Sequence, residues 1–236
     1  MKKIIHSANS RGFADHGWLL SRHTFSFANY YNPDRMGFGK LRVLNDDIVA
    51  PGMGFGTHPH DNMEIVSIPI TGGLRHKDSM ESEQIIKSGE VQCMSAGSGI
   101  THSEYNVSAS GEVNFLQIWV LPKEHDIEPR YAQRHYDLKA QKNQFLTVVS
   151  PDKESKDALW INQDAWFSLA TLEEGRTLKY KTHDRQPAVY VFLISGKITI
   201  DGETLNERDA MAITDLTAIE IAGNKEADIL LIETSL

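Results

Sequence analysis

Two stretches decide the fold and the chemistry expected of this 236-residue chain: THPHDNME at 57–64 and SAGSGITHSEYN at 95–106. Each carries two metal-type side chains two positions apart, namely His58 and His60, then His102 and Glu104. In a β-strand, residues i and i+2 point to the same face. Two such strands lining one barrel would therefore direct three imidazoles and one carboxylate at a single point.

The rest of the sequence predicts a mostly β protein. Short apolar runs alternate with Gly, Pro and Asn turns, and no segment of about twelve residues holds a helical period. We therefore expect an all-β fold with few short helices. Strands are predicted at 64–70, 91–94, 114–121, 188–194 and 227–233, and the alternating HTFSFANY at 23–30 is also read as a strand. The polar segment 123–144 is predicted to be a linker.

A faint internal repeat predicts two similar domains. ITGGLRHKD at 70–78 resembles ISGKITID at 194–201, so we expect two small β-barrels or jelly rolls, 1–135 and 136–236. The second-copy positions that correspond to the four ligand candidates hold Lys181, His183, Ile221 and Gly223. Only one of these four is a ligand type, so the second domain is predicted to bind no metal, with His183 a surface or packing residue.

Composition limits the classes of partner and the compartment. With 24 basic and 32 acidic residues the net charge is −8, which argues against a nucleic-acid-binding surface. The single cysteine, Cys93, permits no intramolecular disulfide and suits a reducing compartment. Because the chain shows neither a signal-peptide core nor an apolar run of about 20 residues, we expect a cytoplasmic protein without a membrane partner.

The candidate ligands favour a first-row transition metal. An H-x-H pair alone is a weak signal, since two strand histidines occur often, but a second His-x-acid pair behind its own Gly-rich turn strengthens it. Three imidazoles and a carboxylate suit Fe(II), Mn(II), Ni(II), Cu(II) or Zn(II). No thiolate is present in the set, so a closed structural zinc site is not expected. Four protein ligands leave two octahedral positions open for water, substrate or dioxygen.

The spacing of these residues resembles the cupin superfamily. Its first motif is similar to the segment from Gly52 to Gly72, with both histidines and Glu64; its second is similar to residues 89–106, with Ser95 where proline is usual and two extra residues before the histidine. In most cupins the first-motif glutamate is the fourth ligand. On this pattern Glu64 competes with Glu104 for that role.

Several longer sequence segments resemble the pirin family of bicupins. These are HTFSFANY at 23–30, GTHPH at 56–60, MSAGSGITHSE at 94–104 and LQIW at 116–119. The resemblance implies an iron-type site in the N-terminal barrel, held by His58, His60, His102 and Glu104. It leaves Glu64 a supporting role. Bacterial members of this length resemble pirin-type quercetin 2,3-dioxygenases.

Several other residues are weaker candidates. His76 and Asp78, on the hairpin after the first ligand strand, are read either as a rim of the pocket or as a surface pair. His23 is read as a packing histidine or a site residue, and Cys93 as a small core residue. The four tryptophans are expected in the core: Trp18, Trp119, Trp160 and Trp166.

Two functions are implied by the resemblance. The first is a dioxygenase that cleaves a flavonol with O2 to a depside and carbon monoxide, with Fe(II) the first choice of metal and Glu104 as both ligand and base. The second is a metal-dependent, redox-responsive regulatory protein that acts on a protein partner. Flavonol cleavage as a side activity on another aromatic or enediol substrate is the third reading.

Overall fold

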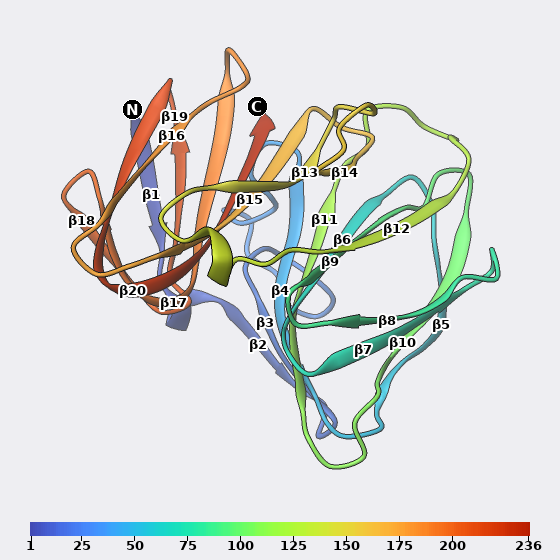
Figure 1. Cartoon of the computed structure of the whole chain (residues 1–236). Helices are drawn as coiled ribbons and strands as arrows, with labels where there is room; N and C mark the ends of the chain where they lie inside the picture. Colours follow the sequence, from blue (N-terminus) through green and yellow to red (C-terminus); the bar gives the residue numbers. More distant parts are fainter. The chain divides into compact units, whose positions relative to one another are not determined.

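The computed structural model describes residues 1–236, nearly all of them in strands, turns and short connections, which confirms the all-β expectation (Figure 1). The only helices are two single turns of 3-10 helix, η1 (Ala8–Ser10) and η2 (Lys139–Gln141). None of the helices is long and apolar enough to cross a membrane. The chain divides into two compact units that we call the N-terminal unit (Gly12–Tyr136 with Ile161–Gln163) and the C-terminal unit (Met1–Arg11, Asp137–Trp160 and Asp164–Leu236).

The N-terminal unit contains two antiparallel sheets. The larger has seven strands in the order β12-β9-β6-β11-β4-β3-β2, and the smaller has four in the order β5-β10-β7-β8. Their bounds are β2 (Gly12–Asp15), β3 (Leu19–His23), β4 (Leu41–Val49), β5 (Gly54–His60), β6 (Glu64–Thr71), β7 (Gly73–Asp78), β8 (Glu83–Lys87), β9 (Glu90–Ser95), β10 (Ile100–Asn106), β11 (Val113–Val120) and β12 (Arg130–His135).

Apolar side chains from both sheets of the N-terminal unit pack together, and this packing leaves a polar region between them. One cluster joins Val49 and Phe115 of the large sheet to Leu74 of the small sheet. A second joins Ile65 and Met94 of the large sheet to Ile100 on β10. The side chains of these two clusters are thereby shielded from water. The two ligand strands, β5 and β10, are neighbours in the small sheet.

The C-terminal unit is built on one sheet that curves around an apolar core. Its order is β1-β19-β17-β20-β15-β13-β14, with β16 paired to β20 and β18 paired to β17. The bounds are β1 (Lys2–His6), β13 (Leu146–Ser150), β14 (Leu159–Trp160), β15 (Ala165–Leu172), β16 (Thr177–Lys181), β17 (Pro187–Ile200), β18 (Glu203–Asn206), β19 (Ala210–Thr214) and β20 (Ala218–Ser235). Compared with the division expected at residue 135, the first eleven residues belong to this unit, because β1 pairs along its length with β19.

Two sequence predictions about local structure were wrong. Residues 23–30 do not form a strand, since β3 ends at His23 and the chain turns. The Ser26 hydroxyl donates to the carbonyl of Asn32, and Ala28 has a φ of 48°, so local hydrogen bonds replace a ladder. The segment 123–144 is not simply a linker either, because its residues 130–135 form β12 on the edge of the large sheet.

Candidate metal centre

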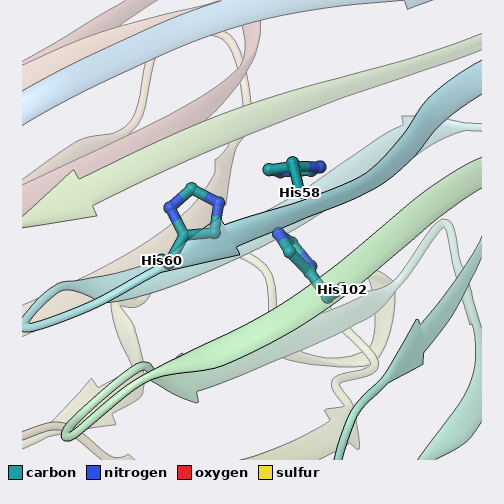
Figure 2. Close-up of side chains that lie close together, drawn as sticks. All are labelled: His58, His60 and His102. Atoms are coloured by element: carbon teal, nitrogen blue, oxygen red, sulfur yellow. The ribbon is translucent and has the colours of Figure 1, made fainter.

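The histidines predicted from the sequence come from two paired strands and face one another (Figure 2). His58 and His60 lie on β5, and His102 lies on β10 directly opposite His58. The alternation of a strand places His58 and His60 on one face, as the spacing predicts. Their pairing with β10 then brings the third imidazole to the same face.

A β-bulge changes the register of this strand pair next to the histidines. The register shifts between His102 and Glu104, so that Glu104 lies opposite Phe55 instead of Gly56. The extra residue on β5 turns the Phe55 side chain to the histidine face, where it contacts the aromatic residues inside the unit. Bulges often occur beside functional sites, where they redirect a side chain.

The three imidazoles lie close enough together to be candidate ligands of one metal ion. One ring nitrogen from each of His58, His60 and His102 lies within 4.8 Å of the other two. Their ring centroids are separated by 4.4 Å for His58 and His102, and by 4.9 Å for each of the other two pairs. Because metal–nitrogen bonds are about 2.0–2.1 Å long for zinc, nitrogens that share one ion lie up to about 4 Å apart, so the three rings would move slightly closer together around an ion.

The hydrogen bonds of the rings leave the correct nitrogens available. His58 Nδ1 lies 2.8 Å from the carbonyl oxygen of Gly56, which can only accept, so Nδ1 carries the proton and Nε2 has a free lone pair. His102 Nε2 is buried and has no hydrogen-bond partner. A buried, unpartnered imidazole nitrogen is costly unless something binds it. These residues therefore fit a transition-metal ion.

Electrostatics keep the rings in the neutral form that metal binding needs. Burial, with the neighbouring His58, lowers the pKa of His60 to about 4. Burial, together with the three histidines around it, lowers the pKa of His102 to about 2. Neutral imidazoles are the ligand form, so neither ring has to lose a proton before it binds at neutral pH.

Glu104 lies beside this group but belongs to a second cluster. Its carboxylate lies within 4.8 Å of ligand nitrogens of His76 and His102. Glu104 Oε2 accepts a 2.7 Å hydrogen bond from the Gln117 amide, and Oε1 accepts a long 3.4 Å bond from the Ser67 hydroxyl. Burial raises the pKa of Glu104 to about 7, against the opposing effect of these two donors. The structure thus joins three of the four predicted ligands in one group and connects the fourth through His102.

Glu64, the other glutamate of the first motif, has a different environment. Its Oε2 accepts hydrogen bonds from the Ser95 hydroxyl at 2.8 Å and from the backbone N–H of Asn162 at 3.0 Å. Burial raises its pKa, while these donors and the positive charge of Arg130 lower it. Glu64 thus holds the 161–163 segment against β6 and β9 and is absent from both ligand groups.

A cavity of about 380 Å³ opens onto the metal-type histidines. Among its walls are four aromatic side chains and a polar patch next to them. The lining consists of His16, Trp18, Leu19, Ser21, His23, Phe27, Ala28, Asn45, Asp47, Phe55, His58, His60, Glu104, Gln117 and Trp119. Its volume lies within the usual range of small-molecule sites, about 300–1,000 Å³.

The structure shows the surroundings of three residues that the sequence singled out more weakly. His23 is 4% exposed and lines the cavity, with Nδ1 3.0 Å from Oδ1 of Asn45. Cys93 is fully buried, as expected of a core residue, and burial raises its thiol pKa to about 12. His183 lies in the C-terminal unit, where Glu233 accepts its hydrogen bonds and Trp166 stacks on its ring at 4.6 Å.

The tryptophans do not form the core that was predicted for them. Trp18 and Trp119 are partly exposed on the cavity wall, and Trp119 meets His60 edge to face at 4.9 Å. Trp160 and Trp166 are also only partly buried. A tryptophan's large ring is rarely fully buried, and here two of the four line a cavity.

Both readings of His76 and Asp78 were wrong. Neither residue is on the surface and neither lines the cavity, because both side chains are 0% exposed and lie behind His102. The signal was present in GLRHKD at 73–78. Leu74, His76 and Asp78 alternate with Arg75 and Lys77, which predicts a strand with one buried face rather than a polar hairpin.

Known proteins resemble the chain over nearly its whole length. Residues 5–120 match the Pirin family, and residues 147–234 match the family described as the quercetinase C-terminal cupin domain. A quercetin 2,3-dioxygenase of Escherichia coli strain K12 is 42% identical over 230 residues, covering 97% of each chain.

Solved structures agree with these matches. The crystal structure of YhhW from Escherichia coli superposes with a TM-score of 0.94 at 40% identity, covering 99% of this chain and 97% of that one. The nickel(II) complex of bacterial pirin YhhW gives a TM-score of 0.93 at 39% identity, covering 99% of each chain. The chain therefore has two cupin domains and belongs to the pirin family.

Proposed function

We propose that the protein is a metal-dependent dioxygenase that cleaves flavonols such as quercetin with O2 to a depside and carbon monoxide. The observation that carries this proposal is the group of three imidazoles, His58, His60 and His102, beside a cavity whose aromatic walls also include Glu104. The name of the Escherichia coli relative supports the same substrate class.

His58, His60, His102 and Glu104 would hold the ion. This ligand set suits several divalent metals, and Fe(II) is the one that the resemblance to pirins implies. When bound, the ion supplies Lewis acidity and one-electron redox chemistry. The surroundings of the three histidines leave ring nitrogens unprotonated and available to a metal ion. Gly56 does so for His58, and the burial of His60 and His102 keeps their rings uncharged.

Glu104 is suited to take the proton of the flavonol 3-hydroxyl. Its Oε2 is occupied by the short hydrogen bond from Gln117, and its Oε1 receives only the long contact from Ser67. Oε1 is therefore the atom that accepts the proton, while Gln117 holds the carboxylate in place. The deprotonated enol is electron-rich and ready for oxidation by O2.

The cavity walls match a flat, hydroxylated substrate. Phe27 and Trp119 meet edge to face at 5.3 Å, as do Trp18 and Phe55, so each pair presents an apolar surface to a planar ring. The polar part of the wall contains Asp47, which can accept hydrogen bonds from substrate hydroxyls. A substrate that fills this cavity would displace water from the reactive enol.

Turnover by the metal-loaded protein tests the proposal. The flavonol absorption of quercetin should fall in air but not under nitrogen, carbon monoxide should appear, and a metal-only control should be slower. His58→Ala should abolish the reaction while the fold is retained. His125→Ala, on an exposed loop, is the matched control and should react like the wild type.

One bound ion per chain without O2-dependent loss of any flavonol would contradict the enzyme. That result would favour the alternative, an iron-dependent redox-responsive regulatory protein of pirin type. Capture of one protein partner by the Fe(II) form but not the Fe(III) form would then be the deciding observation.

A further inference from the structure

Next to His102 lies a buried pair of polar residues that do not line the cavity. His76 and Asp78 are on β7, which pairs with β10. The register places Asp78 opposite His102 and His76 opposite Glu104, so all four side chains share the inner face of the small sheet. The proposed flavonol reaction uses neither residue.

Asp78 is held in one orientation and fixes the proton of His76. Its Oδ1 accepts the backbone N–H groups of Met80 at 2.9 Å and Ser82 at 3.0 Å. Its Oδ2 lies 2.9 Å from Nε2 of His76. Because the carboxylate accepts all three hydrogen bonds, Nε2 of His76 is the nitrogen that carries the proton.

His76 in turn fixes the proton of His102. In the neutral His76 ring, a protonated Nε2 leaves Nδ1 as the acceptor. That Nδ1 lies 3.4 Å from Nδ1 of His102, which is a long hydrogen bond. Of two facing nitrogens one must donate, so His102 carries its proton on Nδ1. Tyr131 stacks on the His76 ring at 4.5 Å and holds its plane.

This chain leaves the lone pair of His102 on Nε2, the buried nitrogen that has no partner. We propose that Asp78 and His76 are positioning residues that set the tautomer and the ring orientation of His102 for metal binding. A metal-ligating histidine usually donates its second ring N–H directly to a carboxylate, a carbonyl or water. Here the imidazole of His76 stands between the carboxylate of Asp78 and the ligand His102. This inference rests on the proposed metal site but is independent of flavonol cleavage.

Asp78→Asn tests the direction of the chain. The Asn oxygen can keep the two backbone hydrogen bonds, and its NH2 group then faces His76. His76 must accept at Nε2 and donate from Nδ1, which forces His102 to accept at Nδ1 and to carry its proton on Nε2. The lone pair is then on the wrong nitrogen. We expect zinc affinity to fall about 10–100-fold.

His76→Leu removes the chain without reversing it. His102 can then adopt either tautomer, so the loss of zinc affinity should be smaller than in Asp78→Asn. A purely structural role predicts the opposite order, since Asp78→Asn keeps the size of the side chain and its backbone contacts while His76→Leu removes a buried ring. Glu83→Gln, an exposed acid-to-amide change on the paired strand β8, is the matched control and should bind zinc like the wild type.

Two readouts separate this inference from the proposed function. Zinc affinity is measured by competition with a chromophoric chelator, and the protonated ring nitrogens are assigned from 15N–1H correlation spectra of the metal-free protein. We expect His102 to be protonated on Nδ1 in the wild type and on Nε2 in Asp78→Asn. A proton on Nε2 in the wild type, or equal zinc affinity in Asp78→Asn and the wild type, overturns the inference. Failure of the wild type to bind zinc would instead refute the proposed metal site. In that case the tautomer of His102 in the spectra would still decide whether this inference holds.

Discussion

Asp47, in the cavity wall, provides a quantitative test of the electrostatics of the pocket. It lies on β4, is 3% exposed and accepts a hydrogen bond from the Ser21 hydroxyl. Burial raises its pKa from an ordinary 3.8 to about 7; the Ser21 bond opposes this rise, and the charges of Asp46 and Glu104 add to it. Between these two pH values the Asp47 carboxyl of the folded protein therefore keeps a proton that the unfolded chain has released.

The sign and size of the effect on stability are set by this difference. The unfolded carboxyl loses its proton near pH 3.8 and the folded one near pH 7, so folding becomes less favourable as the pH rises between these values. A shift of about three pKa units corresponds to roughly 4 kcal/mol over the whole window, at about 1.4 kcal/mol per unit. Between pH 5 and pH 8 the loss in the free energy of unfolding should be roughly 2–3 kcal/mol.

Asp47→Asn removes this titration and keeps an oxygen that can accept the Ser21 hydrogen bond. Urea unfolding of the metal-free proteins at pH 5 and pH 8 gives the free energy of unfolding of each. The variant should gain roughly 2–3 kcal/mol relative to the wild type between the two pH values. Asp34→Asn, on an exposed loop, should show no such gain. If the difference between Asp47→Asn and the wild type is the same at both pH values, the reasoning is refuted.

Three further changes, one of them with a matched comparison, test the fold and the cavity. Gly97→Ala should lower the free energy of unfolding by roughly 2–4 kcal/mol in urea, because φ is +49° and a Cβ would overlap the backbone carbonyl oxygen of Ile127. Gly17→Ala, where φ is +79° but no atom lies within 4 Å, should cost less, and equal costs would contradict the steric argument. Gln117→Leu leaves Oε2 of Glu104 without the donor that lies 2.7 Å away. The free energy of unfolding of the metal-free protein should therefore fall by about 1–3 kcal/mol in the same assay. An unchanged free energy of unfolding would show that this hydrogen bond is dispensable. Trp119→Ala should weaken quercetin binding about tenfold in a fluorescence titration, as expected for the loss of an aromatic contact worth about 1.5 kcal/mol. Zinc affinity should stay at the wild-type value. A loss of zinc affinity would instead mean that Trp119 supports the metal site.

The metal-type histidines were predictable because their signal is local. The spacing of His58 and His60 fixes their common face whatever the rest of the chain does, and the segment around His102 repeats the pattern. The all-β class was predictable for the same reason, since short alternating runs between turn residues cannot form helices. The pairing of the two ligand strands with each other is a feature that the sequence could only suggest.

The rest of the site depends on register between distant strands. His23, Asn45 and Gln117 lie in one row across three strands, and no local pattern connects them. The error at 23–30 has a local cause, since polar and apolar side chains alike are buried in a turn that local hydrogen bonds hold, and alternation there does not mark a strand. The register limit does explain the 123–144 segment, whose polar β12 is an edge strand and needs only β9 as a neighbour.

Anomalous diffraction from crystals of the zinc-loaded protein tests the central claim most directly. The account predicts one strong peak per chain in the N-terminal unit, about 2.0–2.2 Å from a nitrogen of His58, His60 and His102 and from a carboxylate oxygen of Glu104. A peak bonded to other residues, or no peak near the three imidazoles at full zinc loading, would contradict it.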